Sequence, residues 1–127
     1  MKRRIKALAQ LQHLARLRSD LEMRRFSAYR SSVAAARDRI GQIEDELHQL
    51  YEVPEAFSIS GARLTNALAG DRTRALHREE GELQRMLPGF ETARQAAMRE
   101  FGRAEVLREL RRNLVAQDRA QRQRREE

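Results

Sequence analysis

The apolar residues in the first half of the chain recur at intervals of three and four residues. From residue 26 to residue 50 this spacing is unbroken, at Phe26, Tyr29, Val33, Ala36, Ile40, Ile43, Leu47 and Leu50. Such alternation is typical of the seam of a coiled coil. Because no proline lies between residues 2 and 52, the pattern predicts one long helix over 2–52.

Three leucines continue the same spacing towards the N-terminus, at Leu14, Leu17 and Leu21, but the frame slips before Phe26. A straight helix of 3.6 residues per turn drifts in this way against a seven-residue repeat. We therefore expect the leucines to extend the seam along a gently wound helix.

Residues 53–70 interrupt the helical pattern. Pro54 disfavours helical geometry at Val53 and removes a backbone donor, so the first helix is expected to end there. The serines and glycines that follow predict a connection with a short helix, capped by Ser60 and closed by Gly70. Asp71 is then a favourable N-cap for a second long helix over 71–124.

The second helix carries two sets of apolar residues. Leu76, Leu83, Met86, Phe90, Ala93 and Ala97 share one frame, and Leu107, Leu110 and Leu114 share a shifted one. Pro88-Gly89 interrupts the first set and predicts either a kink or a break. The apolar spacing continues across the proline, which favours the kink.

Two helices of this length joined by a short connection predict an all-α fold, an antiparallel coiled-coil hairpin. The chain is expected to form a single elongated domain over 1–127. Each helix offers one apolar row and no third layer is evident, so the core is thin and encloses no pocket. We expect a monomeric hairpin rather than a dimer.

Composition excludes several other classes of protein. The chain lacks Cys and Trp and is 35% charged and 5% aromatic. Disulfide scaffolds and zinc ribbons need cysteine, and β-sandwiches need β-branched and aromatic residues. The longest uncharged apolar run, 33–36, is far too short to span a membrane. A cytoplasmic protein is expected; the alternative is a mitochondrial presequence, which the acid-free residues 1–19 resemble in composition.

Charge is distributed unevenly along the chain, whose net charge is +7. Residues 1–25 sum to +6, residues 40–55 to −5 and residues 92–127 to +4. A hairpin brings both basic regions to one end and places the acidic region at the other. The basic end, with Arg3, Arg4, Arg111 and Arg112, is therefore either a solvated face or a contact for an anionic partner.

Signals for catalysis are weak. The chain has no glycine-rich phosphate loop and no cysteine nucleophile. Glu44, His48 and Glu52 share one helix face, but a carboxylate-bridged metal bundle needs Glu-x-x-His on two helices, and the order around His77 is wrong. We expect no enzyme, no catalytic residue, no cofactor and no metal, with a metal-carboxylate bundle as a third alternative.

The basic composition also supports binding to nucleic acid or to an anionic membrane surface. No aromatic residues interleave with the arginines for base stacking, so a contact with phosphates would rest on charge alone. The segment with Ile5, Leu8, Leu11 and Leu14 among basic residues could lie on a membrane surface. Coiled-coil packing is the competing interpretation of that segment.

The order of segments resembles a known family. A basic first helix containing Leu8-Ala9-Gln10-Leu11 precedes an Arg/Glu-rich coiled coil and a Ser/Gly-bearing interruption. The closing helix runs through 103–112, with the sequence RAEVLRELRR. This pattern is similar to that of the flagellar FliJ family and its type III secretion stalk relatives, over nearly the whole chain.

The resemblance implies a non-enzymatic coiled coil that contacts a hexameric export ATPase and an export-gate protein, without a small-molecule substrate. It places the basic end, Arg3, Arg4, Arg111 and Arg112, in the ATPase ring. It places Leu64, Leu68 and Leu76 towards the gate. The family usually has an aromatic-containing stretch there and an acidic-Leu-Ala ending, whereas this chain has neither and ends in RREE. The implied location is cytoplasmic, peripheral to the inner membrane through the export apparatus.

Overall fold

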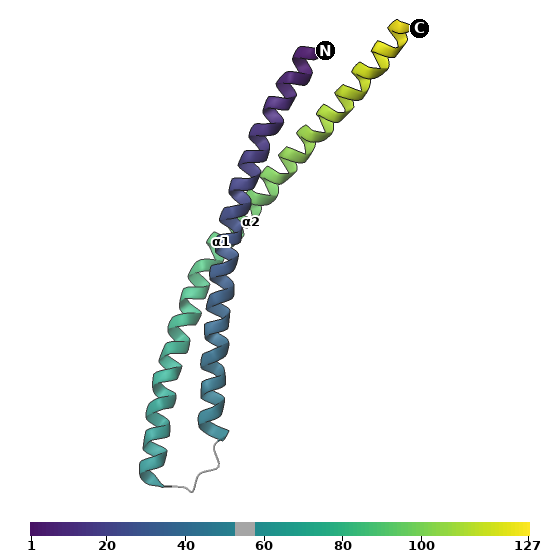
Figure 1. Ribbon diagram of the computed structural model, residues 1–127. Coiled ribbons are helices and arrows are strands. Elements are labelled where there is room, and N and C mark those ends of the chain that lie inside the picture. Colours follow the sequence, from purple (N-terminus) through teal and green to yellow (C-terminus); the bar gives the residue numbers. More distant parts are fainter. Residues whose placement is uncertain (53–57) are drawn as a thin grey trace. The chain divides into compact units, whose positions relative to one another are not determined.

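The all-α fold is confirmed by a computed structural model, which describes residues 1–52 and 58–127. Two helices make up the described chain, α1 (Lys2–Glu52) and α2 (Ile59–Glu126). They form an antiparallel helical hairpin (Figure 1). The expected end of the first helix at Pro54 lies outside the described residues.

The second helix begins earlier than expected. Ser58, rather than Ser60, caps it: the Gly61 N–H donates to Ser58 Oγ at 3.0 Å, and the Ala62 N–H donates to the Ser58 carbonyl at 2.9 Å. A serine side chain that accepts from the third helical amide is the usual N-cap arrangement. The expected helix start at Asp71 is therefore wrong.

The expected short helix is part of α2. In the described chain no glycine has a positive φ, so Gly70 does not end a helix, and Asp71 accepts from Arg72 Nη2 at 3.1 Å instead of capping. Ala69 is buried and Leu76 half-buried, and the two lie seven residues apart on the same seam. A continuous seam keeps the helix intact across Gly70.

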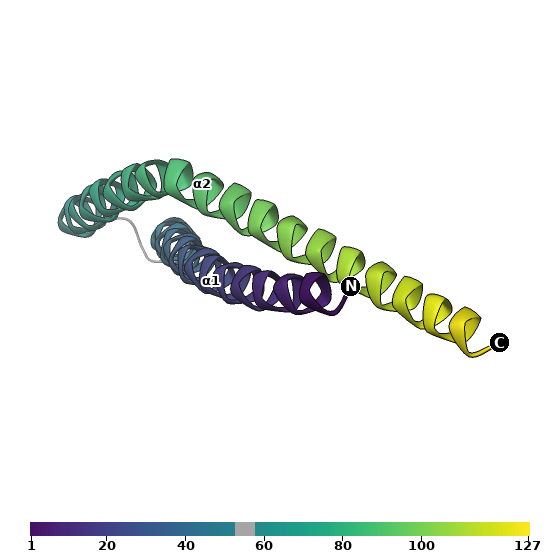
Figure 2. The same ribbon diagram turned by 90° about the horizontal axis from the view of Figure 1, so that it is seen from above.

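Pro88 lies inside α2 without breaking it, and Figure 2 shows the helix uninterrupted from its teal start to its yellow end. A proline removes one backbone donor, here the one that would bond to the Gln84 carbonyl. Met86 and Phe90 on either side are half-buried at seam spacing, so packing holds the helix together at this point. The alternative of a break at Pro88-Gly89 is thus excluded.

The chain divides into two compact units instead of one continuous domain. The basic unit comprises residues 1–27 and 91–127, and the acidic unit comprises residues 28–90. The basic unit holds 18 basic and 9 acidic residues, a net charge of +9, and the acidic unit holds 8 basic and 10 acidic residues, a net charge of −2. Both chain ends belong to the basic unit.

Three contacts fix the antiparallel register in the acidic unit. Arg39 Nε donates to Glu79 Oε2 at 3.0 Å, and Arg72 Nη1 donates to Glu46 Oε2 at 3.1 Å. The Tyr29 ring lies against Gly89, where an added Cβ would meet the ring carbon Cε1 at 2.8 Å. The partners of successive α1 residues move back along α2 by the same number of residues, as expected for antiparallel helices.

The seam of α1 is one unbroken heptad frame from end to end. Its members are buried or half-buried except Tyr29, which is 42% exposed but packs on Gly89: Ile5, Leu8, Gln12, Ala15, Ser19, Glu22, Phe26, Tyr29, Val33, Ala36, Ile40, Ile43, Leu47 and Leu50. All eight expected seam residues from Phe26 to Leu50 belong to it. The expected slip of the frame near Leu21 does not occur.

The seam of α2 is equally continuous. It includes Leu83, Met86 and Phe90, as expected, and its buried or half-buried members are Ala62, Thr65, Ala69, Arg72, Leu76, Glu79, Leu83, Met86, Phe90, Ala93, Ala97, Glu100, Ala104, Leu107, Leu114 and Asp118. Arg111 occupies the seam position between Leu107 and Leu114. Leu110, expected on the seam, is 50% exposed and lies off it.

Glycines in the helices give a test of the Tyr29–Gly89 contact. Gly41 and Gly102 have open space where a Cβ would stand, so replacing either with Ala should stabilise the fold by about 0.5–1 kcal/mol. Gly89→Ala should lose that gain, because its Cβ would displace the Tyr29 ring. The measurement is the free energy of unfolding from urea denaturation. In a Tyr29→Ala background, adding Gly89→Ala should again raise the free energy of unfolding. Equal effects of Gly41→Ala, Gly89→Ala and Gly102→Ala in the wild-type background would disprove the contact.

Candidate interaction site in the basic unit

The first turn of α1 carries an unusual concentration of positive charge for a helix start. Lys2, Arg3 and Arg4 follow the N-terminal residue, and the first turn contains no acidic residue. The amino end of a helix bears partial positive charge, so each cation there is unfavourable by about 0.3–1 kcal/mol. These three residues therefore do not serve the stability of α1.

Most cations of α1 in the basic unit lack an anionic partner. Within the described chain, Arg25 is the one basic residue of 1–27 that forms an ion pair, to Glu22 at 3.0 Å. The others are Lys2, Arg3, Arg4, Lys6, Arg16, Arg18 and Arg24. Their charge is available to an external anion.

The arginines of α2 in the basic unit are arranged differently. Several pair with an acid three or four residues before them, including Arg94 with Glu91 at 2.6 Å and Arg122 with Asp118 at 3.3 Å. The hydrogen bond to Arg94 holds the pKa of Glu91 below its ordinary value. Exposed pairs of this spacing support a helix by only tenths of a kcal/mol.

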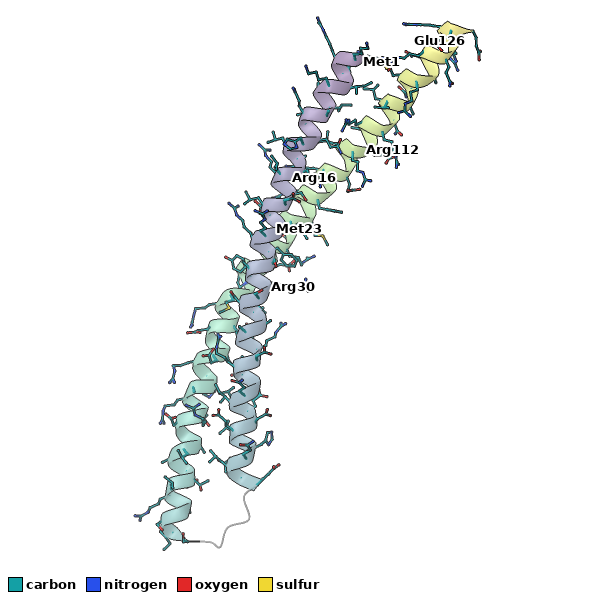
Figure 3. All side chains as sticks on the ribbon, viewed as in Figure 1. Met1, Arg16, Met23, Arg30, Arg112 and Glu126 are labelled. Carbon is teal, nitrogen blue, oxygen red and sulfur yellow. The ribbon has the colours of Figure 1, made fainter. Side chains whose placement is uncertain are left out.

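A groove between the helices of the basic unit is lined by four arginines of α2. Arg108, Arg111, Arg112 and Arg119 face it together with Gln12 of α1, Val115 and Ala116. Arg111 Nη1 donates to Gln12 Oε1 at 3.1 Å, which links the two helices. Arg112 donates to Glu109, and this hydrogen bond raises the pKa of Arg112. Figure 3 marks Arg112 on α2 and Arg16 on α1 in this unit.

A second groove lies at the chain ends. It is lined by Met1 and by Lys2 and Arg3 of α1, and α2 contributes Asp118, Gln121, Arg122 and Arg125. Figure 3 shows Met1 and Glu126 at the same end of the basic unit. Arg122 and Arg125 add two cations close to the crowded first turn of α1.

The four expected basic-end residues are thus brought into one unit but not into one cluster. Arg3 lines the groove at the chain ends, Arg111 and Arg112 line the groove at Gln12, and Arg4 is exposed outside both. From Arg3 to Gln12 is nine residues, about 14 Å along a helix. The cations opposite Arg3 are instead Arg122 and Arg125. A heptad frame that continues to the end of α2 would have predicted that Arg122 and Arg125 lie opposite the start of α1.

The three leucines expected to face a gate protein are also divided. Leu64 is 62% exposed and Leu68 is 45% exposed, whereas Leu76 is half-buried in the seam of the acidic unit. Leu76 is therefore held by α1 and is not available to a partner. Leu64 and Leu68 remain one helical turn apart on an open face.

Two further features bear on what the site can do. In the described part of the chain, no group of three or more His, Asp or Glu side chains could hold a metal ion. Across residues 1–52 and 58–127, neither helix has a stretch long and apolar enough to cross a membrane.

Comparison with known proteins finds no matching protein family, no matching curated protein and no matching solved structure.

Proposed function

We propose that the protein is a non-enzymatic coiled-coil stalk or adaptor of the bacterial flagellar type III protein export apparatus. In this proposal the basic unit contacts the export ATPase ring, and the start of α2, with Leu64 and Leu68, faces the export gate. The protein would work in the cytoplasm, peripheral to the inner membrane through that apparatus. The partners come from the resemblance to the FliJ family described above.

One observation supports a docking role for the basic unit above all. Seven of the eight cations in residues 1–27 form no ion pair with any residue that the structure describes, and three of them stand where the helix itself disfavours positive charge. The net positive charge of the basic unit favours association with a partner of opposite sign and accelerates the encounter. A chain stabilised only for itself would carry acidic residues at this helix start.

A second candidate function rests on the groove at Gln12. Four arginines facing one groove would also suit the phosphates of nucleic acid or of an anionic membrane. Such binding would depend on charge alone and would weaken steeply with salt.

A three-way titration separates these functions. Labelled full-length protein is titrated with the cognate export ATPase, with duplex DNA and with vesicles containing anionic lipid, at low and at physiological salt. The proposal expects association with the ATPase, and a change in its hydrolysis rate, that persist at physiological salt. Binding to DNA or vesicles alone would favour the second function, and absence of any effect on the ATPase would overturn the first.

A further inference from the structure

Three leucines of α1 form an apolar row that the hairpin does not use. Leu14 is 47% exposed, Leu17 is 52% exposed and Leu21 is 48% exposed. Their intervals of three and four place them on one side of the helix. We call this row the leucine stripe.

The stripe points away from α2. The seam over the same segment is made by Gln12, Ala15, Ser19 and Glu22, of which Ala15 and Ser19 are buried. At 3.6 residues per turn, the centre of the stripe lies about 140° around the helix from that seam. Small and polar residues thus hold α1 to α2, while the large apolar ones face outward.

The stripe is as narrow as the face with which one helix of a coiled coil contacts another. A row with apolar residues only at alternating intervals of three and four is the narrow seam of a coiled coil, whereas a membrane-surface helix needs a broader apolar face. The stripe therefore fits one further helix better than a lipid surface.

The residues beside the stripe are basic. Arg18 and Arg25 lie on one side of it, and Lys6 and Arg24 lie on the other, with Asp20 as an acid on that second side. Of the four cations, Arg25 alone has an ion pair among the described residues. A second copy of this chain packed on the stripe would set cations against cations, which disfavours self-association.

We propose that the leucine stripe docks an acidic amphipathic helix of another protein, with apolar residues at heptad spacing and Glu or Asp in the flanking positions. The apolar row supplies the contact, and Lys6, Arg18 and Arg24 select the sign of the partner's flanks. This inference stands independently of the export apparatus, since it concerns a face of α1 and not the grooves of the basic unit.

The test uses a synthetic peptide of about four heptads, with Leu at the seam positions and Glu in the flanks, and a matched peptide with Lys in the flanks. Binding to the full-length protein is measured by fluorescence anisotropy, and helix formation in the peptide by circular dichroism. The Glu peptide should bind and gain helix, and the Lys peptide should not bind. The variant Leu14→Gln/Leu17→Gln/Leu21→Gln should weaken binding at least tenfold.

The matched control is Met98→Gln/Val106→Gln/Leu110→Gln, which replaces three exposed apolar side chains of α2 and should bind the Glu peptide like the wild type. All six side chains are exposed, so both variants should keep the wild-type helix content. Equal binding by the stripe variant, or equal binding of the two peptides, would overturn the proposal. So would stripe-dependent attachment to anionic vesicles, or a stripe-dependent dimer in sedimentation, without binding of the Glu peptide.

Discussion

Replacing Lys2, Arg3 and Arg4 together with Glu is expected to stabilise the start of α1 while it weakens docking of the basic unit. Three acids at a helix start complement the helix dipole, and each is worth about 0.3–1 kcal/mol over a neutral residue. Amides of the first turns should therefore exchange about tenfold more slowly with solvent. The same change removes three unpaired cations from the proposed contact, so affinity for the export ATPase should fall at least tenfold.

A matched control for this variant lies in the acidic unit. Arg30, Arg37 and Arg74 are exposed and form no ion pair within the described chain, so Arg30→Glu/Arg37→Glu/Arg74→Glu changes the net charge by the same amount. This control should leave both the exchange of the first turns and the affinity for the ATPase near wild type. A similar loss of affinity in both variants would mean that overall charge, and not the basic unit, governs association.

A second large effect is expected at the most tightly packed residue of the seam. Ala36 is 0% exposed, and its neighbour Ala35 is exposed. Ala36→Glu places an ionised carboxylate between the helices without a partner and should cost about 3–5 kcal/mol. That is a large share of the stability of an ordinary domain, about 5–15 kcal/mol, so the hairpin should unfold at much lower urea concentration.

Ala35→Glu is the control, because it introduces the same residue one position away on the open face. Glutamate is a good helix former, so this variant should stay within about 0.5 kcal/mol of the wild type. Urea denaturation followed by circular dichroism measures both. Equal destabilisation by the two substitutions would show that the seam does not run through Ala36.

The sequence predicts the seam well where large apolar side chains occupy it. Val33, Ile40 and Ile43 stand out from their polar neighbours, and their heptad spacing leaves one interpretation. The second helix is equally clear at Leu83, Met86 and Phe90. In these segments, hydrophobicity and burial coincide.

In the basic unit the same reasoning selects the wrong residues. Ala15 and Ser19 are buried although neither is strongly apolar, because small side chains allow two helices to approach closely. Leu14, Leu17 and Leu21 are the conspicuous apolar residues there, yet they face outward. The apparent slip of frame in the sequence reflects two separate rows, one of small and one of large side chains, which lie on different sides of α1.

The sequence predicts which unit carries the positive charge but not which cations lie together. Net charge by segment correctly places the positive excess with both chain ends, since a hairpin brings them into one unit. The pairing of individual cations depends on register, which charge counts do not contain. Arg3 therefore lies near Arg122 and Arg125 instead of Arg111 and Arg112.

The central claim is that the cations at the start of α1 serve a partner at the expense of the helix that carries them. The most direct test measures two quantities on the same preparation of Lys2→Glu/Arg3→Glu/Arg4→Glu: amide exchange of the first turns of α1, and affinity for the export ATPase. We predict opposite changes, slower exchange together with at least tenfold weaker binding. Unchanged affinity, or a loss of affinity accompanied by faster exchange, would contradict the account.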